Sequence, residues 1–304
     1  MTAPSTADEI RDVNERYHDV AAVTYDSKWG IDFGPVGFSQ VTGKLEKVLG
    51  SPLPDLGRIV EIGCGTGYFS LNLLLGGACD SVVATDISPG MIVALEANAK
   101  RLDLKVETHC CEAGSLPLPD ASVDTVIGHA VLHHLPDLEA SFAEFFRVLK
   151  PGGRLFFGGE PSKLGDRIAR VPKGAAGRAA PAWRAIMRAK PAPAAHADGS
   201  GSEHDHSLEQ CVDVHAFEPK ALSEPALAAG FEHVGVVGEE LLANWFGWTN
   251  RTLEATADPA DVPMAWRNYA YRGYLALQKV DRALLEGRLP ASIFYNLMIG
   301  AEKP

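Results

Sequence analysis

The chain has 304 residues, 46% hydrophobic and 22% charged, and its 39 acidic and 28 basic side chains give a formal net charge of −11. This composition excludes global disorder, no apolar stretch reaches the ~18–20 residues of a membrane span, and the first residues lack the pattern of a secretory signal, so we expect a cytoplasmic protein. The sequence pI near 5.4 argues against nucleic acid as the main partner, because binding phosphates needs clustered positive charge.

Two helices are predicted at the start of the chain, over 7–29 and 40–49, and they form an N-terminal helical cap at 1–50. Short β-branched runs then alternate with helical patterns. The runs predict strands at 58–62, 82–86, 104–110, 122–128 and 154–158, and the segments between them predict helices at 67–75, 88–101 and 137–149. Because this alternation is typical of βαβ units, we predict an α/β core with a parallel, Rossmann-like sheet at 51–160.

The segment 172–202 differs in composition, since 19 of its 31 residues are Ala, Gly or Pro. We expect a mobile loop or lid there, within an insertion at 161–216, because such a segment buries little apolar surface. The remainder, 217–304, is expected to complete the core. It contains a predicted helix at 220–229, strands at 231–237 and 292–301, and a helical, aromatic-rich insertion at 241–290.

A glycine-rich turn follows the first predicted strand of the core, in the run VEIGCGTG at 60–67. Gly63, Gly65 and Gly67 leave the backbone bare for a close approach to a ligand. The helix that begins near Gly67 points its amide donors toward a ligand carboxylate, and Glu61 supplies a negative charge suited to an ammonium. A ligand with both groups is an amino acid rather than a pyrophosphate.

Two further sites follow the next strands. Asp86 lies 23 residues after Gly63, close to the spacing of an acidic residue that binds ribose hydroxyls. Glu112-Ala113 is placed to meet an adenine edge, since open α/β sheets bind ligands at the carboxyl ends of their strands. Amino acid, ribose and adenine together indicate S-adenosylmethionine (SAM).

The stretch from Tyr25 to Glu160 resembles the class I SAM-dependent methyltransferases, in particular the small-molecule "type 11" branch that includes ubiquinone and menaquinone methyltransferases. The resemblance rests on EIGCGTGYFS, TDISPGMI, CEAGSLPLPDASVD, HAVLHHLPD and RVLKPGGRLFF. It implies a seven-stranded sheet whose last strand is antiparallel, and methyl transfer from SAM to a small molecule. The residues that it implies for binding SAM are Tyr25, Glu61, Gly63, Cys64, Gly65, Gly67, Asp86, Ile87, Met91, Glu112, Ala113 and His129.

Three histidines follow the fourth predicted strand of the core, near the expected position of the methyl group. A hydroxyl or an acidic carbon must lose a proton to accept a methyl group, whereas an amine need not. We therefore hypothesise that His129 or His133 assists deprotonation, with His134 as a weaker candidate.

The segment 161–190 has eight basic residues and one acidic residue, which is Asp166. This local charge of +7 suits an anionic substrate, an acidic carrier protein or a membrane surface, and it also suits an ordinary solvated surface. No metal site is predicted, because the stretch with His204, Asp205, His206, Cys211 and His215 lacks the spacing of known zinc motifs.

Three alternative functions remain open. A SAM-binding regulatory or partner protein without turnover would keep the same donor site. A nucleic-acid methyltransferase is disfavoured by the acidic composition, and an NAD-dependent oxidoreductase is disfavoured because Tyr68 stands where its fingerprint needs a third glycine. The acceptor itself, whether a quinone, polyketide, lipid or glycolipid precursor, and the acceptor atom are not readable from the sequence.

Overall fold

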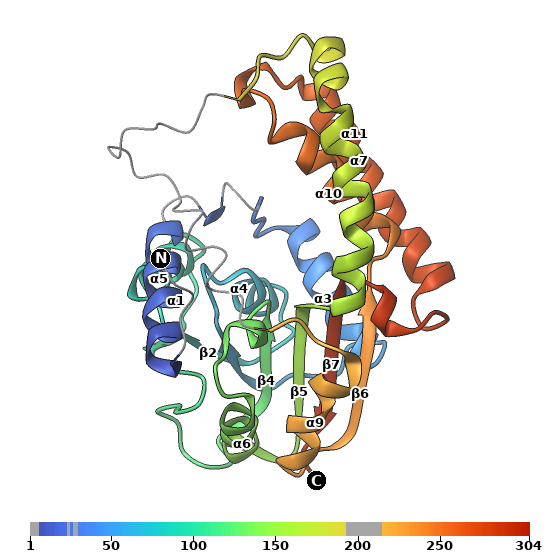
Figure 1. Ribbon diagram of the computed structural model, residues 1–304. Helices are drawn as coiled ribbons and strands as arrows, with labels where there is room; N and C mark the ends of the chain where they lie inside the picture. Colours follow the sequence, from blue (N-terminus) through green and yellow to red (C-terminus); the bar gives the residue numbers. More distant parts are fainter. Residues whose placement is uncertain (1–5, 23–24, 27–29, 193–214) are drawn as a thin grey trace. The chain divides into compact units, whose positions relative to one another are not determined.

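The computed structural model of the chain (Figure 1) describes residues 6–22, 25–26, 30–192 and 215–304. Its contacts divide the chain into two compact units. We call the first the sheet unit; it comprises 1–160, 204–236 and 298–304. The second, comprising 161–203 and 237–297, is the helical unit. The two insertions predicted separately from the sequence thus contribute to one folded unit. Among the described residues, no helix has both the length and the apolar character that crossing a bilayer requires.

The predicted sheet is present, and its seven strands lie in the order β3-β2-β1-β4-β5-β7-β6. Neighbouring strands from β3 to β5 pair in parallel. Backbone bonds join Gly152 to Lys303 at the start of β5 and Ser162 to Tyr295 at its end, so β7 runs antiparallel to it. This confirms the predicted sheet with an antiparallel last strand. The strands are β1 (Arg58–Ile62), β2 (Ser81–Asp86), β3 (Glu107–Cys110), β4 (Val123–His129), β5 (Leu149–Pro161), β6 (Glu232–Glu239) and β7 (Asn296–Glu302).

Helices connect and cover these strands, and the middle strands β1 and β4 are buried along almost their whole length. Such apolar strands are typical of a parallel sheet covered on both faces. Ser88 and Asp137 cap two of the helices by accepting the amide N–H groups of Met91 and Ala140. The helices of the sheet unit are α1 (Ala7–Ala22), α3 (Pro35–Leu49), α4 (Tyr68–Leu75), α5 (Pro89–Arg101), α6 (Leu138–Val148), α9 (Pro219–Ala228) and the 3₁₀ turn η1 (Leu132–His134).

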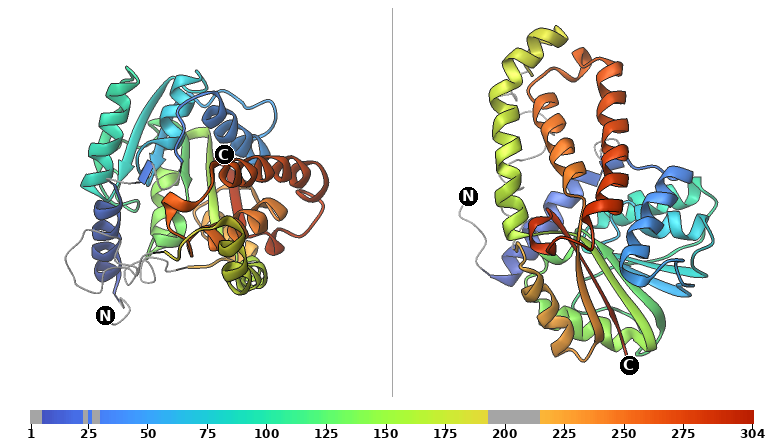
Figure 2. Two further views of the ribbon diagram at one scale, coloured as in Figure 1. Left: turned by 90° about the horizontal axis from the view of Figure 1, so that it is seen from above. Right: turned by 90° about the vertical axis from the view of Figure 1, so that its right-hand side faces the viewer.

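The helical unit is built on three helices, α7 (Lys163–Met187), α10 (Leu242–Glu254) and α11 (Met264–Val280), seen side by side in Figure 2. Helix α10 packs against both α7 and α11. Trp183 on α7 stacks edge-on against Trp266 on α11, with ring centroids 5.2 Å apart. Three short turns complete the unit: η2 (Pro259–Asp261), the π-helical η3 (Asp281–Leu285) and η4 (Ala291–Ile293).

We expected a mobile loop or lid from residue 172 onward. A loop is wrong as far as residue 187, because α7 continues as one helix to Met187. Alanine supports this helix, since it has the highest helix propensity of all residues. Ala169, Ala176, Ala180 and Trp183 recur at helical spacing and are buried, so their small side chains allow α10 to approach closely. Of the two internal prolines, Pro181 is exposed and Pro172 is half-buried at the edge of this face. The remaining part of the expected loop, from 193 to 202, lies outside the described residues.

Candidate functional site

The glycine-rich turn between β1 and α4 has the left-handed backbone that its sequence requires. Gly63 and Gly67 have φ angles of +62° and +91°. A Cβ atom added to Gly63 would come within 2.5 Å of the Val131 side chain, and one added to Gly67 within 2.8 Å of Leu71. Any larger residue is therefore excluded by both strain and space. The turn leaves main chain exposed beside β4.

Asp86 ends β2 and joins the glycine turn to the next loop. One of its carboxylate oxygens accepts the N–H of Gly65 at 2.9 Å, and the other accepts the N–H of Ser88 at 2.9 Å. Burial raises the pKa of this carboxyl, while the nearby His18 and these amide donors oppose the rise. Asp86 is 7% exposed and lines a pocket at the carboxyl ends of the strands.

This pocket contains most of the residues that the sequence assigned to SAM. Its wall comes from the sheet unit alone, from the ends of β1, β2 and β4, the loops that follow β2 to β4, and α1. Nine of the predicted residues lie in it: Tyr25, Gly63, Gly65, Asp86, Ile87, Met91, Glu112, Ala113 and His129.

Four of the predicted residues do not line the pocket. Gly67 caps α4 and Cys64 is buried within the turn. Glu61 is 2% exposed and accepts the amide N–H of Ser70 at 3.1 Å, so its carboxylate faces the first turn of α4. This hydrogen bond joins β1, which contains Glu61, to the beginning of α4. The fourth residue is His133, described below.

Burial of Glu61 has a consequence for stability. Its surroundings raise its pKa to about 8, mainly by desolvation, and the nearby charge of Asp86 adds to the rise. Between the ordinary carboxyl pKa and about 8, the folded chain therefore holds a proton that the unfolded chain lacks. Its stability should fall as pH rises through this window, by up to about 1.4 kcal/mol per pH unit.

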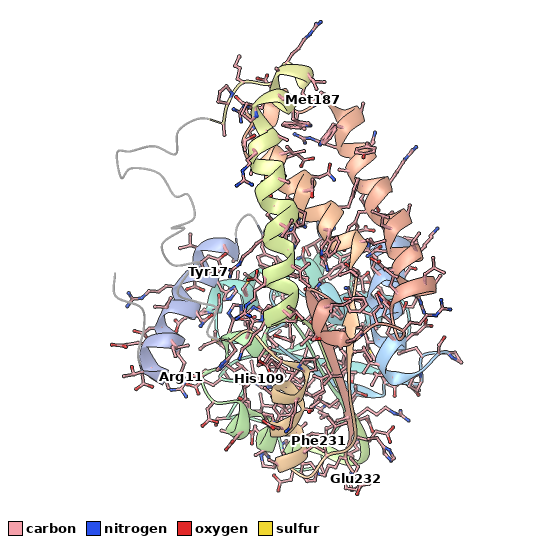
Figure 3. The ribbon with its side chains drawn as sticks, turned by 45° about the vertical axis from the view of Figure 1, so that its right-hand side comes forward. Arg11, Tyr17, His109, Met187, Phe231 and Glu232 are labelled. Carbon is pink, nitrogen blue, oxygen red and sulfur yellow. The ribbon has the colours of Figure 1, made fainter. Side chains whose placement is uncertain are left out.

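We expect Glu61→Gln to flatten this decline, since glutamine does not ionise. Urea unfolding at several pH values between 5.5 and 8 measures it. Glu232→Gln is the matched control, because Glu232 is an exposed carboxylate on β6 (Figure 3). If the free energy of unfolding falls with pH equally steeply in the wild type and in Glu61→Gln, the raised pKa of Glu61 is wrong.

Helix α1 supplies pocket residues that the sequence analysis did not single out, namely Arg11, Asn14 and His18. Figure 3 shows Arg11 on this helix. Its guanidinium lies 2.8 Å from the carboxylate of Glu112, the residue predicted to meet adenine. A helix was predicted here, but no local pattern places it over the ends of the strands.

Glu160, at the end of β5, holds the turn that carries His133 and His134. Its carboxylate is fully buried and accepts the backbone N–H groups of Val131, Leu132 and His133 at 3.0 to 3.1 Å. The same carboxylate lies 2.7 Å from Nδ1 of His133. His133 is 8% exposed and does not line the pocket.

Two of the three candidate histidines line the pocket: His129, the last residue of β4, and His134. The ring of His134 lies between those of His133 and His18, at centroid distances of 4.0 and 5.4 Å. His129 stacks on Phe69, with ring centroids 4.7 Å apart. His134, the weaker candidate from sequence, thus lines the pocket together with His129, whereas His133 does not.

The histidine-rich stretch after residue 200 is described only from His215. Its Nε2 lies 3.0 Å from the carbonyl oxygen of Leu135, and its backbone N–H donates to the carbonyl of His133. His215 therefore supports the turn that carries His133 and His134. Residues His204, Asp205, His206 and Cys211 lie outside the described part of the chain.

Several proteins that this chain resembles are methyltransferases. Residues 60–157 match the family model described as "Methyltransferase domain". A malonyl-[acyl-carrier protein] O-methyltransferase of Yersinia pestis is 29% identical over 160 residues, covering 45% of this chain and 58% of the relative. The 27-O-demethylrifamycin SV methyltransferase of Amycolatopsis mediterranei is 33% identical over 148 residues, covering 45% of this chain and 53% of the relative. The match thus spans just over half the length of these curated relatives.

The fold extends the similarity over nearly the whole chain. Phosphoethanolamine N-methyltransferase 2 of Haemonchus contortus, solved in complex with S-adenosyl-L-methionine, superposes with a TM-score of 0.60 and 18% identity. The superposition covers 97% of this chain and 60% of that one. The predicted resemblance to class I SAM-dependent methyltransferases is confirmed.

Proposed function

We propose that this chain is a SAM-dependent methyltransferase that acts on a small-molecule acceptor. The observation that carries the proposal is the single pocket that joins the glycine turn, Asp86 and the adenine-side residues Ile87, Glu112 and Ala113. Left-handed glycines and a buried carboxylate at adjacent strand ends suit an amino acid joined to a nucleoside. The match of 60–157 to a methyltransferase domain supports the same activity.

Different residues of the pocket would bind different parts of SAM. Gly63 and Gly65 would admit the amino-acid end, Asp86 would accept hydrogen bonds from the ribose hydroxyls, and Met91 would pack beside the adenine. SAM supplies a methyl group already activated on its sulfonium. The protein must therefore mainly align an acceptor with that methyl group and exclude water.

A base is also present in the pocket, which favours an acceptor that must lose a proton, such as a hydroxyl or an acidic carbon. His134 is the best placed, because it lines the pocket and its turn is fixed by Glu160. Glu160 faces Nδ1 of His133, so a neutral His133 donates from Nδ1 to this carboxylate. Glu160 and His133 are then positioning residues, and His134 is the candidate catalytic residue.

Relatives that act on rifamycin and on a carrier-bound malonyl group support an acceptor that is either a free small molecule or one attached to a carrier protein. The alignments cover only part of those relatives, and the segment that matches the methyltransferase domain ends within β5. The residues beyond it are therefore the place to look for acceptor specificity.

Titration calorimetry with SAM, its demethylated product and NAD tests the donor, and transfer of a labelled methyl group from SAM to molecules of a cell extract tests turnover. We expect micromolar binding of SAM and of its product, none of NAD, and a labelled small molecule. Binding without any labelled product would favour the regulatory alternative. No retention of either nucleoside at millimolar concentration would contradict the whole proposal.

A further inference from the structure

Charge is distributed unevenly between the two units of the chain. The helical unit, at 161–203 and 237–297, has 14 basic and 10 acidic residues, a formal charge of +4. The sheet unit has the remaining 14 basic and 29 acidic residues, a formal charge of −15. A negatively charged surface would therefore attract the helical unit and repel the sheet unit.

The positive charge of the helical unit forms a stripe along α7. Its exposed members are Lys163, Arg167, Arg170, Arg178 and Arg188, which closes the helix. Their spacing places them on one side of the helix, away from the buried side of Ala169, Ala176, Ala180 and Trp183. Arg170 is paired with Asp166 at 2.9 Å, and Asp166 is the one acidic residue of this helix. At about 1.5 Å per residue, the stripe extends over roughly 37 Å.

Apolar side chains are also exposed on the helical unit. Val171 and Ile186 on α7 are 73% and 74% exposed, and Met264, Tyr269 and Tyr271 on α11 are 66%, 54% and 50% exposed. Helix α11 has three basic residues and no acidic one. Fourteen large hydrophobic side chains are exposed among the described residues, and nine of them belong to the helical unit, which has about a third of the chain.

We propose that the helical unit docks on the surface of an anionic lipid membrane through α7 and α11. Basic side chains attract anionic headgroups, while exposed aliphatic and tyrosine side chains enter the boundary between headgroups and acyl chains. Such a surface needs no fixed complementary shape, which suits groups spread over two helices on either side of α10. An acidic carrier protein would instead contact one compact, shape-matched patch. The docking does not depend on methyl transfer, so it can be tested without an acceptor.

Co-sedimentation of the full chain with phosphatidylcholine vesicles, with and without about 30% phosphatidylglycerol, tests the proposal. We expect binding to the anionic vesicles only, and its loss when salt shortens the range of the attraction. The double variant Arg167→Glu with Arg178→Glu should weaken this binding at least tenfold. The matched control is Lys100→Glu with Lys105→Glu, which changes the net charge equally on exposed residues of the sheet unit.

A second pair of variants separates apolar insertion from charge. Val171→Ser with Ile186→Ser should weaken binding severalfold at constant charge, whereas Val93→Ser, at a 65% exposed position of the sheet unit, should not. Thermal melting and SAM calorimetry of each variant show that the fold and the donor site are intact. They also separate a failure of the docking from a failure of the proposed methyl transfer.

Three results would overturn the proposal. One is equal sedimentation with neutral and anionic vesicles, and another is an equal loss of binding in the α7 variant and its sheet-unit control. The third is no sedimentation with vesicles combined with binding of a purified acidic carrier protein that Arg167→Glu with Arg178→Glu abolishes. This last result would assign the stripe to a protein partner.

Discussion

Replacing Asp86 by alanine is expected to weaken SAM binding at least about 100-fold. Hydrogen bonds to a charged group contribute about 1.5–3 kcal/mol each, and the ribose offers two hydroxyl groups. Losing both corresponds to about two orders of magnitude in the dissociation constant. The variant also loses the acceptor for the amide groups of Gly65 and Ser88, so both loops beside the pocket lose an anchor.

Titration calorimetry measures the effect, and two further variants sharpen it. Asp86→Asn keeps one acceptor oxygen without the charge, so its loss should be smaller than that of alanine. Asp80→Ala should bind SAM normally, because Asp80 is an exposed carboxylate just before β2, at the opposite end of that strand. If Asp86→Ala binds SAM as tightly as the wild type, the ribose assignment is wrong.

Much of the sheet unit could be predicted because its signals are local. β1 has the bounds predicted for it, β2 begins one residue earlier than predicted, and β4 is shifted by one residue at both ends. Their apolar runs need no information from the rest of the chain. The sequence also predicted that Gly63, Asp86 and Glu112 lie together in the pocket wall, since parallel strands bring their carboxyl ends to one edge of a sheet.

Long-range packing was the part that the sequence did not reveal. Arg11 and His18 line the pocket because α1 packs against α5, which no spacing within residues 7–22 indicates. The sequence analysis named Glu160 only as the last residue of the stretch that resembles the SAM-dependent methyltransferases. Its burial against three amide groups depends on the turn at 131–133, some thirty residues away. The signal for this role in the sequence was a carboxylate at the end of an apolar strand.

Helix α7 shows a different difficulty, because composition was interpreted without periodicity. Counted together, Ala, Gly and Pro indicate a loop. The positions of Ala169, Ala176, Ala180 and Trp183 instead repeat with the helical period, and all four are buried. This segment is stabilised as a helix when its buried face packs against α10, which follows α7 by more than fifty residues.

Replacing His134 by alanine is expected to lower kcat about 100-fold or more while SAM affinity changes less than about twofold. Positioned acid–base groups contribute about 10²–10⁴ to rates, and His134 lines the pocket without being one of the residues assigned to SAM. Labelled methyl transfer to the acceptor found in the extract gives kcat, and calorimetry gives the affinity. His109→Ala is the control: His109, which Figure 3 labels, lies on β3, does not line the pocket and pairs with Glu107.

Glu160→Gln tests whether the turn that carries His134 needs the buried carboxylate. Glutamine keeps the shape and one acceptor oxygen, whereas alanine would leave buried amide groups unsatisfied at a cost of about 1–3 kcal/mol each. We expect Glu160→Gln to lower kcat, and its combination with His134→Ala to lower kcat no further than His134→Ala alone. When two residues act through one group, the effects of replacing them on kcat do not add. Additive losses would show that Glu160 acts independently of His134, and full turnover of His134→Ala with intact SAM binding would remove His134 from the base role.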